Sequence, residues 1–225
     1  TVHSMHVQGT HPDMNPEVIY VHRGDVVLDI WPILLYGKDR EKHIERIAVD
    51  RVRFELESNN DRYPDSTLQK NFRLFRRYDP ARPKPPLVHI HELQVTNSTV
   101  HTLNLDKQRI FDYGVDSLRA ELMIYPEYFN LYAFITGKTN RMDVGGGYKF
   151  MEDRPFQIHA RVRQDKASKK LTFLDSTKVV LAGTPIHLAG TWNVGPRSYF
   201  DARLQAPKGN FETLMSFLPT SLNKQ

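Results

Sequence analysis

Residues 156–163 read Phe-Gln-Ile-His-Ala-Arg-Val-Arg, in which apolar and polar side chains alternate without a break. Successive side chains of a β-strand point to opposite faces, so this period of two predicts a strand with one dry face and one solvated face. The same alternation recurs at residues 118–124 and 129–135. Short turns link such segments, which favours an antiparallel meander of about a dozen strands. Open sheets of that length curl, close or split. We therefore expect a mainly β chain whose long antiparallel sheet curls into an open groove.

The N-terminal part of the chain is predicted to contain further strands. Residues 1–15 are polar, and we expect them to form a mobile end. Residues 18–21 and 25–30 read as two separate strands, and residues 44–57 read as one long strand. Residues 87–105 read as a β-hairpin that turns near Asn97-Ser98.

Three short helices interrupt the predicted strands, at residues 31–36, 66–77 and 210–218. Pro32 and Gly37 bracket the first helix, as is common at the start and end of a short helical turn. A proline-rich stretch at residues 80–86 predicts a stiff linker. The predicted organisation has three parts: an N-terminal β module (1–62), a helix with the linker (63–86), and a β-meander that continues the groove and ends in a helix (87–225).

The composition excludes several kinds of function. The 225 residues include no cysteine, which removes disulfides, thiolate nucleophiles and cysteine-bound metals. The formal net charge is only +5, with 26 acidic residues mixed among 31 Lys and Arg, so we interpret the charge as an ordinary solvated surface. We expect no nucleic-acid partner. No apolar run approaches the roughly 18–20 residues of a membrane-spanning helix.

Few residues in the sequence have the spacing of a chemical site. His89 and His91 share one face of a predicted strand, a geometry that some metal sites use. A third ligand is not close in sequence, so we expect a polar sheet face there and no metal site. His3, His6 and His11 lie in the polar N-terminal end, where metal binding would be adventitious.

Signatures of enzymes are also missing from the sequence. Residues 143–147, Asp-Val-Gly-Gly-Gly, lack the Lys-Ser/Thr of a phosphate-binding loop, so we read them as a bend. The chain contains no Gly-x-Ser-x-Gly nucleophile elbow. We therefore expect no enzymatic activity and no cofactor.

The predicted helix at residues 66–77 carries an apolar stripe flanked by cations. Such a helix most often covers the end of its own sheet, and an anionic membrane surface is the alternative partner. The cations that would face the membrane in the second case are Lys70, Arg73, Arg76 and Arg77.

Several segments, taken in order, are similar to AsmA-like proteins. Residues 26–57 form a strand, a Trp-Pro-Ile-Leu-Leu-Tyr-Gly turn and a long Ile-Glu-Arg-Ile strand, which resembles the N-terminal part of that family. Residues 111–118 look like its later strands. Residues 179–192 resemble its recurrent strand pair with a Gly-Thr-Pro turn, and residues 201–219 resemble its closing strand and helix.

The resemblance to the AsmA-like and TamB-like family implies a protein of the Gram-negative envelope. Such a protein projects into the periplasm and is held by an inner-membrane helix, which would lie outside this sequence. The family looks like a set of bridge proteins that bind and conduct phospholipids in a long curled β groove, in support of outer-membrane biogenesis or maintenance. The residues that we expect to line the groove are Val52, Phe54, Leu56, Leu122, Ile124, Leu131, Ile135, Ile158 and Val162.

Two alternatives remain open from the residues alone. In the first, the apolar strand faces close on each other in a structural or adhesive β-sandwich that admits no lipid. In the second, the chain is a carbohydrate-acting or carbohydrate-binding module that uses Trp31, Trp192 and exposed tyrosines as stacking platforms.

Overall fold

The computed structural model describes residues 1–9, 14–28, 42–59, 87–143, 149–193 and 199–207, and structural statements here refer to these residues. They form twelve strands: β1 (Val2–Gln8), β2 (Glu17–Leu28), β3 (Lys42–Ser58), β4 (Val88–Asn104), β5 (Arg109–Ile124), β6 (Tyr128–Asp143), β7 (Lys149–Phe150), β8 (Arg154–Asp165), β9 (Lys170–Phe173), β10 (Lys178–Leu181), β11 (Thr184–Asn193) and β12 (Tyr199–Gln205). The mainly β fold is confirmed. The three predicted helices all lie outside the described residues, and within those residues no helix is long and apolar enough to cross a membrane.

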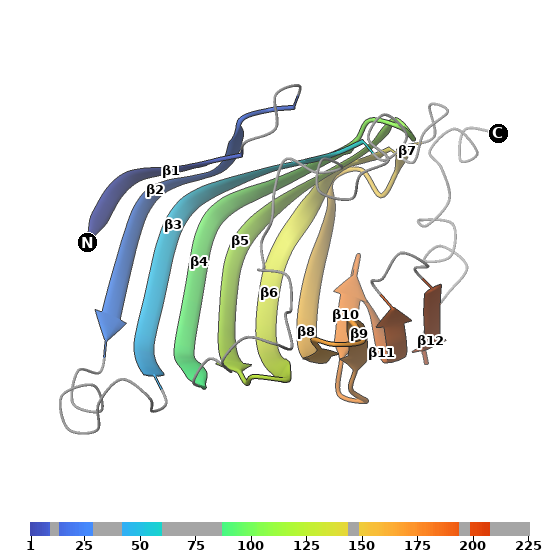
Figure 1. Ribbon diagram of the computed structural model, residues 1–225. Coiled ribbons are helices and arrows are strands. Elements are labelled where there is room, and N and C mark those ends of the chain that lie inside the picture. The colour runs from blue at the N-terminus through green and yellow to red at the C-terminus, as the bar shows by residue number, and fades with distance from the viewer. Residues whose placement is uncertain (10–13, 29–41, 60–86, 144–148, 194–198, 208–225) are drawn as a thin grey trace.

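All twelve strands belong to one sheet, in the order β1-β2-β3-β4-β5-β6-β8-β10-β11-β12 (Figure 1). Strand β7 pairs with β6, and the short β9 pairs with both β8 and β11. The sheet continues from β3 to β4, so it joins strands from both sides of the predicted linker.

The prediction of a purely antiparallel sheet is wrong at one place. Strands β3 and β4 pair in parallel from Lys42↔Val88 to Ser58↔Asn104, so the sheet is mixed. Parallel neighbours need a long crossover connection, because the chain must return to the end at which the first strand began. Residues 59–87 provide that connection, and a two-residue hairpin could not.

The strand assignments near the N-terminus also differ from the sequence prediction. Residues 2–8 form β1 on the outer side of β2, where a mobile end was expected. The strand predicted at 18–21 and the described part, 25–28, of the strand predicted at 25–30 both belong to the single strand β2. The predicted hairpin at 87–105 is instead one 17-residue strand, β4.

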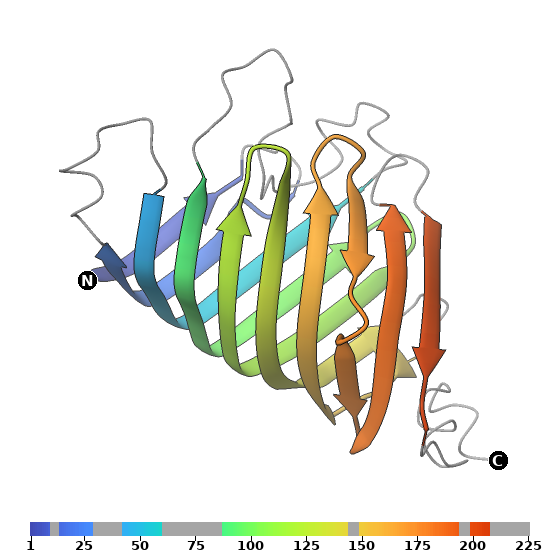
Figure 2. The ribbon, with the colours of Figure 1, turned by 90° about the horizontal axis from the view of Figure 1, so that it is seen from below.

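Asn97 marks a bend in β4 where the sequence suggested a turn. It has a positive φ of 51°, as do Arg51 (53°) in β3 and Ser4 (53°) in β1. Asp50 pairs with Thr96, so Arg51 and Asn97 lie side by side in the two strands. Positive φ is uncommon for residues other than glycine and is typical of bulges that bend a strand. The long strands accordingly curve along their length (Figures 1 and 2).

The bend changes which side chains share a face. Val49 and Val52 are three residues apart and would lie on opposite faces of a regular strand. With Arg51 in the left-handed region between them, both join one apolar cluster. The buried members of that cluster are Val21, Val52 and Val95, and the residues packed against them are Ile19, Val49, Phe54, Leu93 and Leu118.

Three buried hydroxyl groups complete the backbone hydrogen bonding where strand pairing is interrupted. Ser98 Oγ accepts a hydrogen bond from the Val52 N–H at 3.0 Å, next to the bend. Thr139 Oγ1 accepts one from the Arg154 N–H at 3.1 Å, at the start of β8. Thr177 Oγ1 bonds both backbone groups of Arg161, between β9 and β10. These side chains replace backbone partners, which buried N–H groups require.

Candidate functional site

Two rows of paired apolar side chains cross most of the strands of the sheet. One row runs in register through Leu28, Ile44, Ile90, Leu122, Leu131, Val162 and Phe173. The second row runs through Val49, Val95, Leu118, Ile135, Ile158, Val179 and Ile186. Paired residues of adjacent strands share a face, so each row is a continuous apolar line across the sheet.

Most of these apolar side chains are only partly covered. Val95 and Val162 are buried, whereas Leu122, Leu131 and Ile158 are half-buried. Leu28 at one side of the sheet remains 51% exposed. The extensive contacts between described elements are those between strands paired in the sheet. Among the described residues, therefore, no second sheet is packed on this apolar face.

The nine residues predicted to line a groove can be placed on this face. Leu122, Leu131 and Val162 belong to the first row, and Ile135 and Ile158 belong to the second. Ile124 is paired with Phe129 one step beyond the first row. Val52 and Phe54 join the cluster at the bend, and Leu56 follows them on the same face by alternation. The basic residues Lys70, Arg73, Arg76 and Arg77 lie outside the described residues, as does Trp31.

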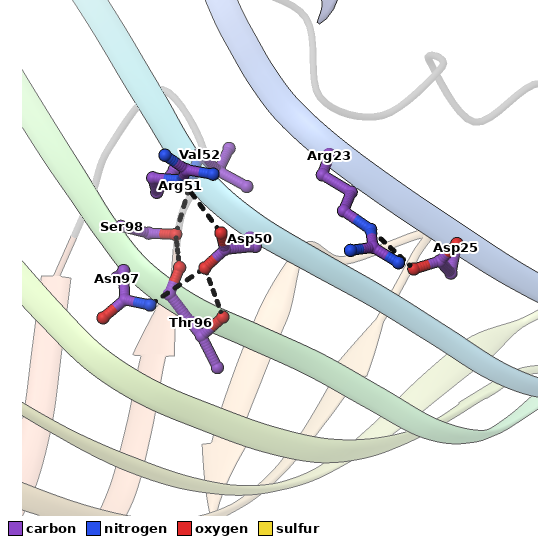
Figure 3. Close-up of polar contacts among 8 residues, drawn as sticks. All are labelled: Arg23, Asp25, Asp50, Arg51, Val52, Thr96, Asn97 and Ser98. Atoms are coloured by element: carbon purple, nitrogen blue, oxygen red, sulfur yellow. Dashed lines mark hydrogen bonds and ion pairs between the residues drawn. The ribbon is translucent and has the colours of Figure 1, made fainter. Parts of the chain in front are cut away.

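A polar cluster holds β3 to β4 at the bend, and Asp50 lies at its centre (Figure 3). The Asp50 carboxylate accepts hydrogen bonds from Thr96 Oγ1 at 2.8 Å, Asn97 Nδ2 at 2.9 Å and Arg51 Nε at 2.9 Å. The hydrogen bonds from Asn97 and Thr96 contribute most to lowering the pKa of Asp50, which falls from 3.8 to about 2. Asp50 is therefore ionised at neutral pH and ties together the two parallel strands where they curve.

The face opposite the apolar rows carries cations and aromatic rings. The Arg163 guanidinium lies 3.9 Å from the centre of the Tyr128 ring, and Arg161 lies 5.6 Å from that of Tyr132. His159 contacts Phe134 edge to face, with 4.5 Å between ring centres. The side chains of Phe134, His159, Arg161 and Arg163 are exposed, so this face is the solvated one.

An open depression of about 520 Å³ lies on this second face, across β4, β5, β6 and β8. Its polar lining has mixed charge, because Arg119 and Arg161 are cationic and Glu92 and Glu121 are anionic. Tyr132 and Phe134 add aromatic surface. The predictions from sequence did not include this depression, because its lining comes from four strands whose register was unknown.

Three histidines come together beside the depression. His89 and His91 share a face of β4, as predicted, and the parallel pairing places His43 of β3 directly beside His89. One ring nitrogen of each residue lies within 4.8 Å of the others. The sequence offered no third ligand near the His89-Ile-His91 pair, because His43 is brought there by a parallel register and not by proximity in the chain.

Comparison of the chain with protein-family models, with curated proteins and with solved structures gave no match.

Proposed function

We propose that this chain binds and conducts the acyl chains of phospholipids along its apolar sheet face, as a non-enzymatic AsmA-like protein of the Gram-negative envelope. In this proposal the chain works in the periplasm at the inner membrane and contributes to building or maintaining the outer membrane. The observation that carries the proposal is the pair of apolar rows, each of which crosses seven strands, without a packed sheet over them among the described residues.

Physical chemistry supports a lipid as the occupant of this face. Each CH₂ group of an acyl chain that leaves a bilayer costs about 0.8 kcal/mol in water. A long apolar row removes that cost at every position without specific polar contacts, so the chain can slide along it. The half-buried Leu122 and Leu131 of the first row and the half-buried Ile158 of the second provide such surfaces.

The curvature of the sheet supports a groove as the form of this surface. Val21, Val52 and Val95 are buried at the bend, although the strands that contain them have described contacts mainly with their sheet neighbours. Such burial is expected where a sheet folds around its apolar face, because side chains on the inside of a bend crowd one another. The charged headgroup would then remain in solvent at the edge of the groove.

The proposal is tested by site-specific photo-crosslinking in a Gram-negative host. A photoreactive phenylalanine analogue is placed at Ile158, on the apolar face, and in a matched variant at His159, the next residue on the opposite face. We expect phospholipid adducts, detected by mass spectrometry of the purified protein, at position 158 and at most background amounts at position 159. Equal labelling at the two positions, or no adduct at 158 in a folded protein, would contradict lipid binding on this face.

A carbohydrate-binding module is the second candidate, because Trp192 is 40% exposed on β11 and Phe200, 55% exposed, pairs with it on β12. Aromatic side chains of this kind can stack on sugar rings. Binding on a glycan array that is abolished by Trp192→Ala, together with an absence of lipid in solvent extracts of the purified protein, would favour this candidate over lipid conduction.

A further inference from the structure

The three histidines beside the depression belong to the solvated face of the sheet. In the parallel pair β3–β4, Ile44 lies opposite Ile90 on the apolar face, and the preceding pair His43↔His89 points to the other side. His91 follows His89 by two residues and shares its face. The paired residues of β3 and β4 are 46 positions apart in the chain, and the two strands together supply three imidazoles to one place.

The distances between the imidazoles fit coordination of one metal ion. His43 Nδ1 lies 3.2 Å from His91 Nε2, and the rings of His89 and His91 have centres 3.9 Å apart. Two nitrogens bound to a tetrahedral zinc ion at 2.0–2.1 Å are separated by about 3.3 Å. All three candidate ligand atoms already lie within 4.8 Å of one another, so each pair of nitrogens is within about 1.5 Å of the spacing that a tetrahedral ion requires.

Glu121 provides the outer support that metal-binding histidines usually have. Its Oε1 lies 2.7 Å from His89 Nε2, and it reaches the cluster from the neighbouring strand β5. A carboxylate that accepts a hydrogen bond from one ring nitrogen fixes the orientation of the imidazole and leaves the other nitrogen free for a metal. Because Glu121 engages Nε2 of His89, Nδ1 is the nitrogen of His89 left to bind an ion.

We propose that His43, His89 and His91 bind one divalent transition-metal ion, with Zn²⁺ as the preferred metal and Glu121 as a positioning residue. A donor set of three imidazoles suits Zn²⁺, Cu²⁺ or Ni²⁺ and disfavours Mg²⁺ and Ca²⁺, which take oxygen ligands. Three protein ligands leave a fourth coordination position. The open depression shares His91 and Glu121 in its lining, so water or a small ligand can reach that position.

The site is tested by calorimetric titration of the full chain with ZnCl₂ at pH 7.5. We expect one ion per chain, and at least a ten-fold loss of affinity in His43→Asn and in His91→Asn. The matched control is His159→Asn, because His159 is exposed on the same face in β8 and lies outside the cluster. Its affinity should equal that of the original chain. Glu121→Gln should weaken binding but keep the one-to-one stoichiometry, because it changes the support and not the ligands.

Two further measurements separate this site from unspecific binding. The complex of the original chain with Co²⁺ should show the intense visible absorption of tetrahedral coordination, a readout that does not depend on how well the variants fold. A His3→Asn/His6→Asn variant should bind Zn²⁺ as the original chain does. Unchanged affinity in His43→Asn, loss of binding only in the His3/His6 variant, or a Co²⁺ spectrum typical of octahedral coordination would overturn the proposal.

Discussion

Replacing Thr177 with valine should destabilise the sheet by about 1–3 kcal/mol, although the two side chains have nearly the same shape. Strand β8 pairs with β10 through residues 156–159 and with β9 through residues 162–164, so Arg161 lies at the gap between the two short strands. Thr177 is 1% exposed, and its hydroxyl fills that gap. It accepts the Arg161 N–H at 3.1 Å and donates to the Arg161 carbonyl at 3.0 Å.

The estimate follows from what valine leaves unpaired. The Arg161 carbonyl keeps a hydrogen bond from the Leu174 N–H at 2.9 Å, so the main loss falls on the Arg161 N–H. A buried donor without a partner costs about 1–3 kcal/mol. For a chain of this size, each kcal/mol lowers the melting temperature by roughly 2–4 °C.

The assay is urea denaturation followed by circular dichroism, with Thr172→Val as the matched control. Thr172 is a half-buried threonine on β9, away from the gap, and its variant should differ by less than about 0.5 kcal/mol. A Thr177→Val variant as stable as the original chain would show that the hydroxyl does not replace a backbone partner, and the reasoning about the gap in the ladder would then fail.

Two further predictions concern the bend and its neighbouring strands. Gly137→Ala should destabilise the chain by roughly 2–4 kcal/mol, because an added Cβ would lie 2.1 Å from the Gly114 carbonyl oxygen. Gly114→Ala should be tolerated, because the atom nearest to a Cβ added there, Lys138 Cγ, lies 3.6 Å away. Thermal melts of the two variants check this, and a larger loss in Gly114→Ala would contradict it. Asp50→Asn should lower the free energy of unfolding at pH 7 by about 1 kcal/mol. This loss is smaller than the free energy that corresponds to a pKa lowered to about 2, because the carboxylate is partly exposed and screened by solvent. Because the pKa of Asp50 is lower in the folded chain, its contribution to stability is present above pH 3.8 and is lost as the pH falls through about 2. The urea midpoints of the original chain and of the variant, measured from pH 5 to pH 2, should therefore converge. A constant difference between the two midpoints would refute the assignment.

The strands themselves were largely predictable because their signal is local. The alternation at residues 156–163 identified β8, and that at residues 44–57 identified β3, each within a few residues of the observed bounds. Asn97 misled the prediction for β4 because asparagine accepts a positive φ both in a turn and in a strand that bends and continues. The local sequence does not distinguish these two outcomes, since the difference lies in how the neighbouring strand β3 curves beside it.

Features that depend on pairing between distant segments could not be predicted. Alternation within each strand did predict which of its residues share a face, and Leu122, Leu131 and Val162 accordingly lie in one row. The position of His43 beside His89 followed from a parallel register that no local pattern encodes. Similarly, nothing in the sequence around Thr177 indicates that its hydroxyl replaces a backbone partner.

The parallel pairing of β3 with β4 has a consequence for the order of folding. Strands β4 to β6 and β8 are joined by short connections, so their contacts close small loops, whereas the β3–β4 contact must close the loop formed by residues 59–87. Larger loops lose more chain entropy on closure, and non-local contacts form late. In pulse-labelling hydrogen exchange during refolding, amides of β5 and β6 should gain protection before those of β2 and β3, so the C-terminal meander should act as the template on which the N-terminal strands assemble.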